Sequence, residues 1–426
     1  MARRLSWVGS EALAMLGLAC LALGLRAVYL CRALRLFGTV QFSDFLFMQE
    51  LTKSLAAGQG FTIGGVRVFN QSVGYPAFLS VVYRLFGNDL AVALAVNALL
   101  GVAAVLLVYR LAVVLLRRPD ADEGSDVWTR RAALLAGVLA AVYPDSLLYA
   151  SLVAAENVLI PLMLLLLLSV LHRWPRDWQA GVVVGVLAAL AATVKAHVLF
   201  VCIFIPLLWY IQDRRCVTRT VFAALAAVVC LTPWTVANYR ASGGHVIPFA
   251  AVAGEVILGG TNPNAVGKPT DQYHLSPDEE RGRTPVELDK LRLQKALSYM
   301  RERPVWYAKL LLKKAAYSFS PARDFIFEYE GERFFTPALS RWGTTAFNAL
   351  LLLGSLWGII LLWRNRLAAS AGASLLAASV LLQMVFCAFP RYRFPFLFCL
   401  LPYCAWGLVG TVRALASRAG RAANGT

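Results

Sequence analysis

Long apolar runs recur along this chain, and short polar stretches separate them. Lys195 and His197 interrupt one long run, and we expect them at a membrane surface rather than at mid-bilayer, which divides that run in two. The pattern predicts an all-α integral membrane protein, a polytopic helix bundle of about ten spans. The runs cover residues 10–34, 89–116, 131–149, 152–171, 179–194, 197–212, 219–236, 343–363, 369–389 and 394–414.

Arginine residues mark every second loop between these runs. The positive-inside rule places such loops in the cytoplasm, and both chain termini with them. The pattern predicts a multi-pass protein of the cell inner (plasma) membrane. The arginines are Arg3, Arg4, Arg117, Arg118, Arg130, Arg131, Arg173, Arg176, Arg214, Arg215, Arg219, Arg364, Arg366, Arg413, Arg418 and Arg421.

Composition agrees with a protein whose solvent is lipid. The chain is 59% hydrophobic and 15% charged, whereas soluble domains are about half apolar and a quarter charged. This excludes a soluble globular enzyme, a disordered protein and a disulfide scaffold. The net charge of +17 resides largely in the topology arginines, so we expect no nucleic-acid partner. The eight cysteines lack metal-ligand spacing, and no metal site is predicted.

Two segments remain on the predicted outer side. The first, 37–88, contains an amphipathic stretch at 45–57 and a short apolar stretch at 75–86 that we expect along the membrane interface. The second, 237–341, contains a helical periodicity at 285–320, which indicates a surface-lying helix or, alternatively, a core helix of a small outer domain. The chain thus divides into a transmembrane module at 1–236, the outer segment at 237–341 and C-terminal transmembrane helices at 342–426.

Two acidic residues lie near the predicted membrane surface, where a charge is costly and needs a reason. Asp44 directly follows the first span, and Glu156 begins an otherwise apolar helix. Each has an ordinary explanation, Asp44 as a helix N-cap and Glu156 as a first-turn acid favoured by the helix dipole. The topology, however, places both on the outer face, where they could share one cleft.

Three basic residues are predicted on the same face. Lys195 could be a snorkelling lysine at a helix end or a cation for a phosphate at the membrane surface. Arg391 and Arg393 lie between two spans and break the positive-inside rule locally, which favours a functional role for both.

An ordered set of short motifs resembles the GT-C membrane glycosyltransferases. More narrowly, it resembles the branch of protein O-mannosyltransferases and the bacterial aminoarabinose transferase (glycosyltransferase family 39-like). Each motif is weak alone, but their order and topology from Asp44 to Pro395 are specific. The motifs are Asp44 with Leu51, Leu55 and Gly58-Gln59-Gly60, then Gly74-Tyr75-Pro76, Ala155-Glu156-Asn157, Thr193-Val194-Lys195, Pro233-Trp234 with Asn238-Tyr239, the loop 259–267, and Arg391-Tyr392-Arg393-Phe394-Pro395.

The resemblance implies an enzyme, a hexosyl or pentosyl transferase that uses a polyprenyl-phosphate sugar donor and an acceptor glycan, lipid or protein on the outer (periplasmic) face. Asp44 and Glu156 match the catalytic acids, and Lys195, Arg391 and Arg393 match positions that would hold the donor phosphate. The implied substrate cleft adds five residues to these. They are Tyr75, Asn238, Arg240, Asn262 and Tyr392.

The chain departs from the family pattern at two points. Phe45 occupies the position of a second acid beside the first aspartate, and Ala237-Asn238 replaces an Arg-Asn pair for which Arg240 could substitute. No cofactor is implied, although some GT-C enzymes need a divalent ion. The rival functions are a transporter or flippase of a lipid-linked sugar, and a non-catalytic envelope-assembly scaffold.

Overall fold

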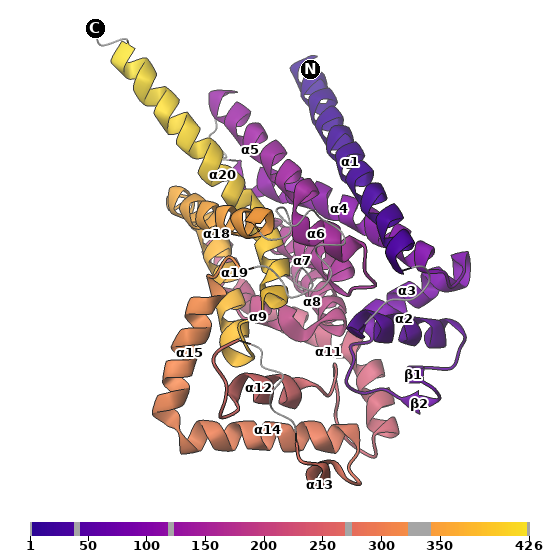
Figure 1. Cartoon of the computed structure of the whole chain (residues 1–426). Coiled ribbons are helices and arrows are strands. Elements are labelled where there is room, and N and C mark those ends of the chain that lie inside the picture. Colours follow the sequence, from indigo (N-terminus) through magenta and orange to yellow (C-terminus); the bar gives the residue numbers. More distant parts are fainter. Residues whose placement is uncertain (1, 38–42, 118–122, 269–274, 323–341, 424–426) are drawn as a thin grey trace.

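The computed structural model describes residues 2–37, 43–117, 123–268, 275–322 and 342–423. Parts of both predicted outer segments, at 38–42, 269–274 and 323–341, lie outside the described residues. The chain is a helix bundle, with both ends at one pole and the helices of the outer segment at the other (Figure 1).

The membrane helices follow the predicted runs. Eight helices or helical stretches among the described residues are long and apolar enough to span a membrane. They are α1 (Ala2–Phe37), α4 (Leu90–Leu116), α8 (Asp177–Val194), the stretch Ala196–Asp213, α11 (Cys216–Ala241), α18 (Thr344–Leu361), α19 (Arg366–Val385) and α20 (Pro390–Ala423). This confirms the predicted all-α polytopic membrane fold.

The two remaining predicted runs are a broken helix and a short one. α5 (Glu123–Val142) and α6 (Pro144–Ala150) meet at a bend of 49° and count as a ninth span if taken together. The break lies at Tyr143, whose ψ of 116° is extended because the following proline disfavours helical backbone before it. α7 (Glu156–Leu171) is a shorter apolar helix of 16 residues.

The predicted division at Lys195 is confirmed. α8 ends at Val194, and Lys195 is extended, with φ −153° and ψ 123°. A 3₁₀ turn (η1, Ala196–Val198), α9 (Leu199–Cys202) and α10 (Ile205–Asp213) then continue the chain.

The first outer segment folds largely as its pattern predicts. The two apolar stretches form α2 (Ser43–Ala56) and α3 (Gly74–Phe86). Between them lies a hairpin that the sequence did not predict, β1 (Thr62–Ile63) and β2 (Val66–Arg67), antiparallel with Ile63 opposite Val66.

The second outer segment corrects one expectation. The periodicity at 285–320 indicated a single helix, but the structure contains two, α14 (Pro285–Glu302) and α15 (Pro304–Ser318), which meet at a corner (Figure 1). Arg303 leaves the helical region, with φ −132° and ψ 60°, since it precedes Pro304. The short helices α12 (Ala253–Thr261) and α13 (Pro277–Glu280) complete this segment.

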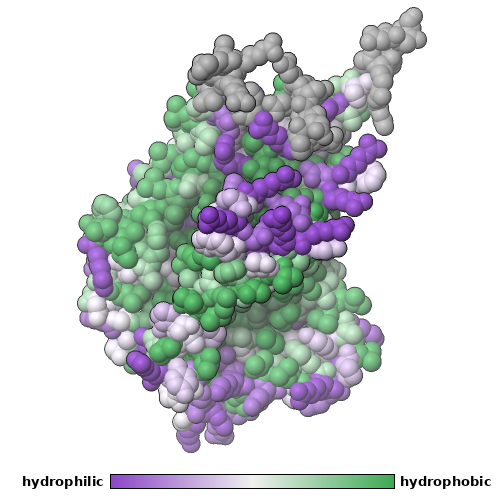
Figure 2. Space-filling model, turned by 180° about the vertical axis from the view of Figure 1, so that it is seen from behind, coloured by the Kyte–Doolittle hydropathy of each residue, from purple (hydrophilic) through white to green (hydrophobic). Residues whose placement is uncertain are grey.

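The bundle is layered around α20. In its apolar window 72% of the residues of α20 are buried, whereas none are in the window of α11. α20 therefore runs through the core beside α18 and α5, and α11 lies at the edge of the bundle against α8. Figure 2 shows broad hydrophobic areas on one face, with hydrophilic side chains along its lower edge and in a second cluster higher on the same face.

Candidate active site

Glu156 begins α7 at the end of an irregular turn, 151–155, and its side chain is completely buried. Two asparagines fix this turn. Asn97 of α4 donates from Nδ2 to the Leu152 carbonyl (2.8 Å), and Asn157 donates to the Tyr149 carbonyl (2.8 Å). The backbone that carries the acid is thus held by buried hydrogen bonds.

Two cations from distant elements meet the Glu156 carboxylate. The Lys195 Nζ lies 2.5 Å from Oε1, and the Arg391 Nε lies 2.7 Å from the same oxygen. The Arg391 Nη2 also donates to Oε2 at 3.5 Å. Lys195 comes from the extended break after α8, and Arg391 is the second residue of α20. Desolvation of a buried carboxylate is costly, and these two cations offset it.

Asp44 completes the cluster from the first turn of α2. Its Oδ2 lies 3.2 Å from the Arg391 Nη1, so one guanidinium bridges both acids. The two acids differ in access, since the Asp44 side chain is 56% exposed and that of Glu156 is 0% exposed.

Aromatic rings surround the cations. The Arg391 guanidinium lies over the ring of Phe45 at 5.2 Å and over that of Tyr149 at 5.8 Å, each distance to the ring centroid. Such cation–π contacts fix the plane of the guanidinium. His197 packs edge-on against Tyr392, with centroids 4.6 Å apart. Sequence reasoning proposed Tyr392 but did not single out Tyr149 or give His197 a role in the site.

The formal charges of the cluster cancel, because two carboxylates face two cations. Burial, together with the positive charge of Arg391, lowers the pKa of the Lys195 amine, and the Glu156 carboxylate opposes this shift. The arrangement offers one solvent-accessible acid beside a pair of oriented cations.

Of four other predicted residues, three serve the surrounding architecture. Tyr75 is buried and donates its hydroxyl to Asn97 Oδ1 (3.1 Å), which extends the support of the turn before Glu156. Asn262 closes the end of α12 by donating to the Gly259 carbonyl (2.9 Å). Asn238 donates to the Ile247 carbonyl (2.9 Å), and Arg240 is exposed near the end of α11.

Arg393, predicted to bind the donor phosphate with Arg391, faces a different set of partners. Its guanidinium donates to the backbone carbonyls of Ser318, Ser320 and Ala322, at and beyond the end of α15. The structure therefore gathers Asp44, Glu156, Lys195 and Arg391, whereas these carbonyl contacts of Arg393 lie at and beyond the end of α15.

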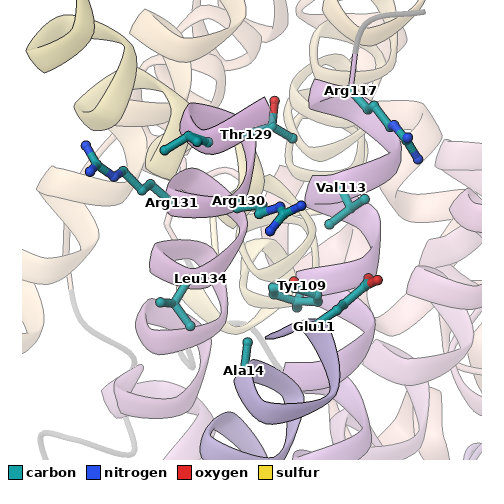
Figure 3. Close-up of a pocket in the computed structure, with 10 residues that line it drawn as sticks. Glu11, Ala14, Tyr109, Val113, Arg117, Thr129, Arg130, Arg131 and Leu134 are labelled. Atoms are coloured by element: carbon teal, nitrogen blue, oxygen red, sulfur yellow. The ribbon is translucent and has the colours of Figure 1, made fainter. Parts of the chain in front are cut away.

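A cavity of about 270 Å³ lies elsewhere, between α1, α4 and α5. In Figure 3 the Arg130 side chain extends from α5 toward α4, where Tyr109 and Glu11 lie close together. Arg110 Nη1 pairs with Glu11 Oε1 at 2.7 Å. None of the predicted site residues lines this cavity.

Part of the chain matches a known protein family. Residues 70–237 match the model of the family described as dolichyl-phosphate-mannose-protein mannosyltransferase. The comparison with curated protein sequences found no significant match.

Two kinds of solved structure are similar to the chain. ArnT from Cupriavidus metallidurans bound to undecaprenyl phosphate is 14% identical, with a TM-score of 0.39, over 94% of this chain and 78% of that one. The same protein in the apo state is 15% identical, with a TM-score of 0.41 and the same coverage. The oligosaccharyltransferase of Archaeoglobus fulgidus, tethered with an acceptor peptide, is 13% identical, with a TM-score of 0.46, over 92% of this chain and 49% of that one.

The family match lies on α3 to α11 and includes Glu156 and Lys195, two of the four residues in the charged cluster. Asp44 and Arg391 lie outside the matched residues, but the fold brings them to the same place. Over residues 70–237, the match confirms the resemblance to GT-C membrane glycosyltransferases that the sequence motifs predicted.

Proposed function

We propose that this chain is a membrane glycosyltransferase that moves a sugar from a polyprenyl phosphate to an acceptor on the outer face of the membrane. The observation that carries the proposal is that the Arg391 guanidinium contacts two acids. One of them, Glu156, is buried, and the other, Asp44, is exposed to solvent. The family description names a dolichyl-phosphate-linked mannose donor, which supports a lipid phosphate donor of the same chemical class.

In this proposal Lys195 and Arg391 bind the donor phosphate. When the sugar leaves, its bond to the phosphate oxygen breaks and negative charge grows on the polyprenyl phosphate. A preorganised cation or hydrogen-bond donor aimed at such charge stabilises the transition state by about 3 kcal/mol. Glu156 holds both cations and has no exposed surface, so its role is to orient them.

Asp44 is the proposed general base. It is the acid in the cluster with exposed surface, so an acceptor hydroxyl or amine can reach it. The carboxylate takes the acceptor's proton while the acceptor atom attacks the anomeric carbon. One direct displacement of this kind inverts the anomeric configuration, and a product of retained configuration would exclude it.

The decisive experiment is a transfer assay with the full chain in lipid nanodiscs, with polyprenyl-phosphate sugars as donors. Asp44→Asn keeps the size of the side chain but removes its basicity, so kcat should fall by about 100- to 10,000-fold. Because the variant retains Lys195 and Arg391, it should still bind the donor, so the loss of activity should appear in kcat.

Glu50→Gln provides the matched control. Glu50 lies on the same helix, and its carboxylate pairs with Lys53 at 3.1 Å outside the cluster. Its loss should leave the rate unchanged. Transfer by Asp44→Asn at the wild-type rate would refute the assignment of the base. Movement of a lipid-linked sugar across the bilayer without transfer to any acceptor would instead favour a flippase.

A further inference from the structure

The turn 386–389 joins α19 to α20 and directly precedes Arg391. The last carbonyls of a helix have no partner within the helix and need donors from elsewhere. Here the donor comes from α15. Lys314 Nζ donates to the Phe386 carbonyl at 2.7 Å and to the Met384 carbonyl at 3.2 Å.

A buried lysine is an unusual donor to the carbonyls at the end of a helix. The whole residue is 0% exposed, and its hydrogen-bond partners are backbone carbonyls rather than a carboxylate. Burial lowers the pKa of its amine to about 8. Placing an ammonium group in such surroundings is costly, and the hydrogen bonds to the two carbonyls offset part of that cost.

Two more contacts from the outer segment fix the same turn. A Cβ on Gly260 of α12 would lie 1.9 Å from the Phe386 carbonyl oxygen, so the backbones touch there and only glycine fits. The Ala388 amide donates to the Gly267 carbonyl at 3.0 Å.

The attachment is reciprocal. Arg393 of α20 donates to carbonyls at the end of α15, including that of Ala322 at 2.5 Å, while Lys314 of α15 donates to carbonyls at the end of α19. Along the chain, Arg391 lies between these two hydrogen-bonded contacts. Its guanidinium extends to Glu156 and Asp44 in the membrane module. A continuous set of contacts therefore leads from α15 to the charged cluster.

We propose that Lys314 is a positioning residue, which holds the turn 386–389 so that Arg391 is set for the donor phosphate. The role in phosphate binding rests on the proposed function, whereas the hold on the turn does not. The outer segment thereby becomes part of the donor site, although its helices contribute no side chain to the cluster of Asp44, Glu156, Lys195 and Arg391.

The first test requires no ligand. Hydrogen–deuterium exchange of the full chain in nanodiscs is compared for wild type, Lys314→Met and Lys309→Met. Lys309 lies on the same helix and is exposed, so it matches the change in charge. Lys314→Met should speed exchange about tenfold or more across 384–394, with α4 unchanged as a check on the fold, and Lys309→Met should match wild type.

The second test measures binding of polyprenyl phosphate and the kinetics of transfer. Lys314→Met should raise the Kd for polyprenyl phosphate and the donor KM about tenfold, and leave the acceptor KM unchanged. Lys314→Arg keeps a charged donor that can reach two carbonyls and should restore part of the affinity. A merely structural lysine would lower the amount of folded protein without this split between donor and acceptor.

The outcomes separate the proposed function from the positioning role of Lys314. Wild-type protein that binds no polyprenyl phosphate overturns the proposed function and, with it, the phosphate role of the turn. Wild-type binding together with a Lys314→Met variant of unchanged exchange and unchanged Kd overturns the positioning role alone.

Discussion

The two acids of the cluster are chemically alike, and their surroundings give them different capacities. Glu156 is enclosed by Lys195 and Arg391 and has no exposed surface. Asp44 touches Arg391 through one hydrogen bond and faces solvent. A side chain enclosed in this way orients its neighbours, while an exposed one can exchange a proton with a substrate. Burial, rather than residue type, thus separates the two proposed roles.

Glu156→Gln should destabilise the fold, because Lys195 loses the carboxylate that it pairs with and buried Arg391 keeps only that of Asp44. Removal of one partner from a buried ion pair costs about 3–5 kcal/mol. The thermal midpoint in detergent should therefore fall well below that of wild type. Asp44→Asn, at a side chain that is 56% exposed, should shift the midpoint far less.

A double variant sharpens this comparison. Glu156→Gln with Lys195→Met removes one charge of each sign and should recover part of the lost midpoint. Equal midpoints for Glu156→Gln and Asp44→Asn would contradict the ranking of the two acids by burial.

At the scale of elements, the site depends on how short outer helices meet the ends of membrane helices. α3 begins at Gly74, where an added Cβ would lie 2.6 Å from the Val194 amide nitrogen and 2.7 Å from the Thr193 carbonyl carbon. Since Lys195 follows these residues directly, the packing of α3 on the end of α8 fixes the backbone beside that cation.

Gly74→Ala should push α3 away from α8 and disturb Lys195. Misplacement of a binding group lowers activity steeply, and we expect kcat/KM for the donor to fall at least about tenfold. Gly24→Ala in α1 is the control, because a Cβ there meets no heavy atom within 4 Å. If both variants transfer sugar equally well, the contact between α3 and α8 does not set the site.

At the scale of the whole molecule, hydropathy predicts the architecture well. The sequence motifs predict the charged cluster only in part. Each apolar run became a helix or a pair of helices, since a chain in lipid must satisfy its backbone internally. The motifs also pointed to Asp44, Glu156, Lys195 and Arg391. They did not reveal which acid is buried, because Glu156 and Arg391 are 235 residues apart and meet only through tertiary packing.

The same limit explains why some contacts and one helix break were not predicted. Arg393 stays a predicted phosphate ligand, but the sequence does not show that its guanidinium also reaches the end of α15. Asn97 gave no signal, and the motif that contains Asn157 did not indicate its role, because a buried asparagine that holds a turn resembles any polar residue in a helix. The corner at Arg303 did carry a signal, Pro304, which the apolar periodicity across it obscured.

The arrangement of the helices predicts a sidedness that can be measured. Both ends of the chain lie at one pole and α12 to α14 at the other (Figure 1). With the arginine-rich loops in the cytoplasm, green fluorescent protein fused after residue 426 should fluoresce. Alkaline phosphatase fused after residue 282 should be active, and the same reporter after residue 365 inactive. The reverse pattern would place the charged cluster on the cytoplasmic side.

The cancelled charges of the cluster have a consequence for the order of events. A phosphate that arrives at Arg391 competes with Asp44 for the same guanidinium, and Asp44 holds it by one contact of 3.2 Å. In the proposed reaction the donor phosphate therefore takes the place of Asp44 on Arg391. The released carboxylate can then turn to the acceptor, so we expect an ordered mechanism in which the donor binds before the acceptor.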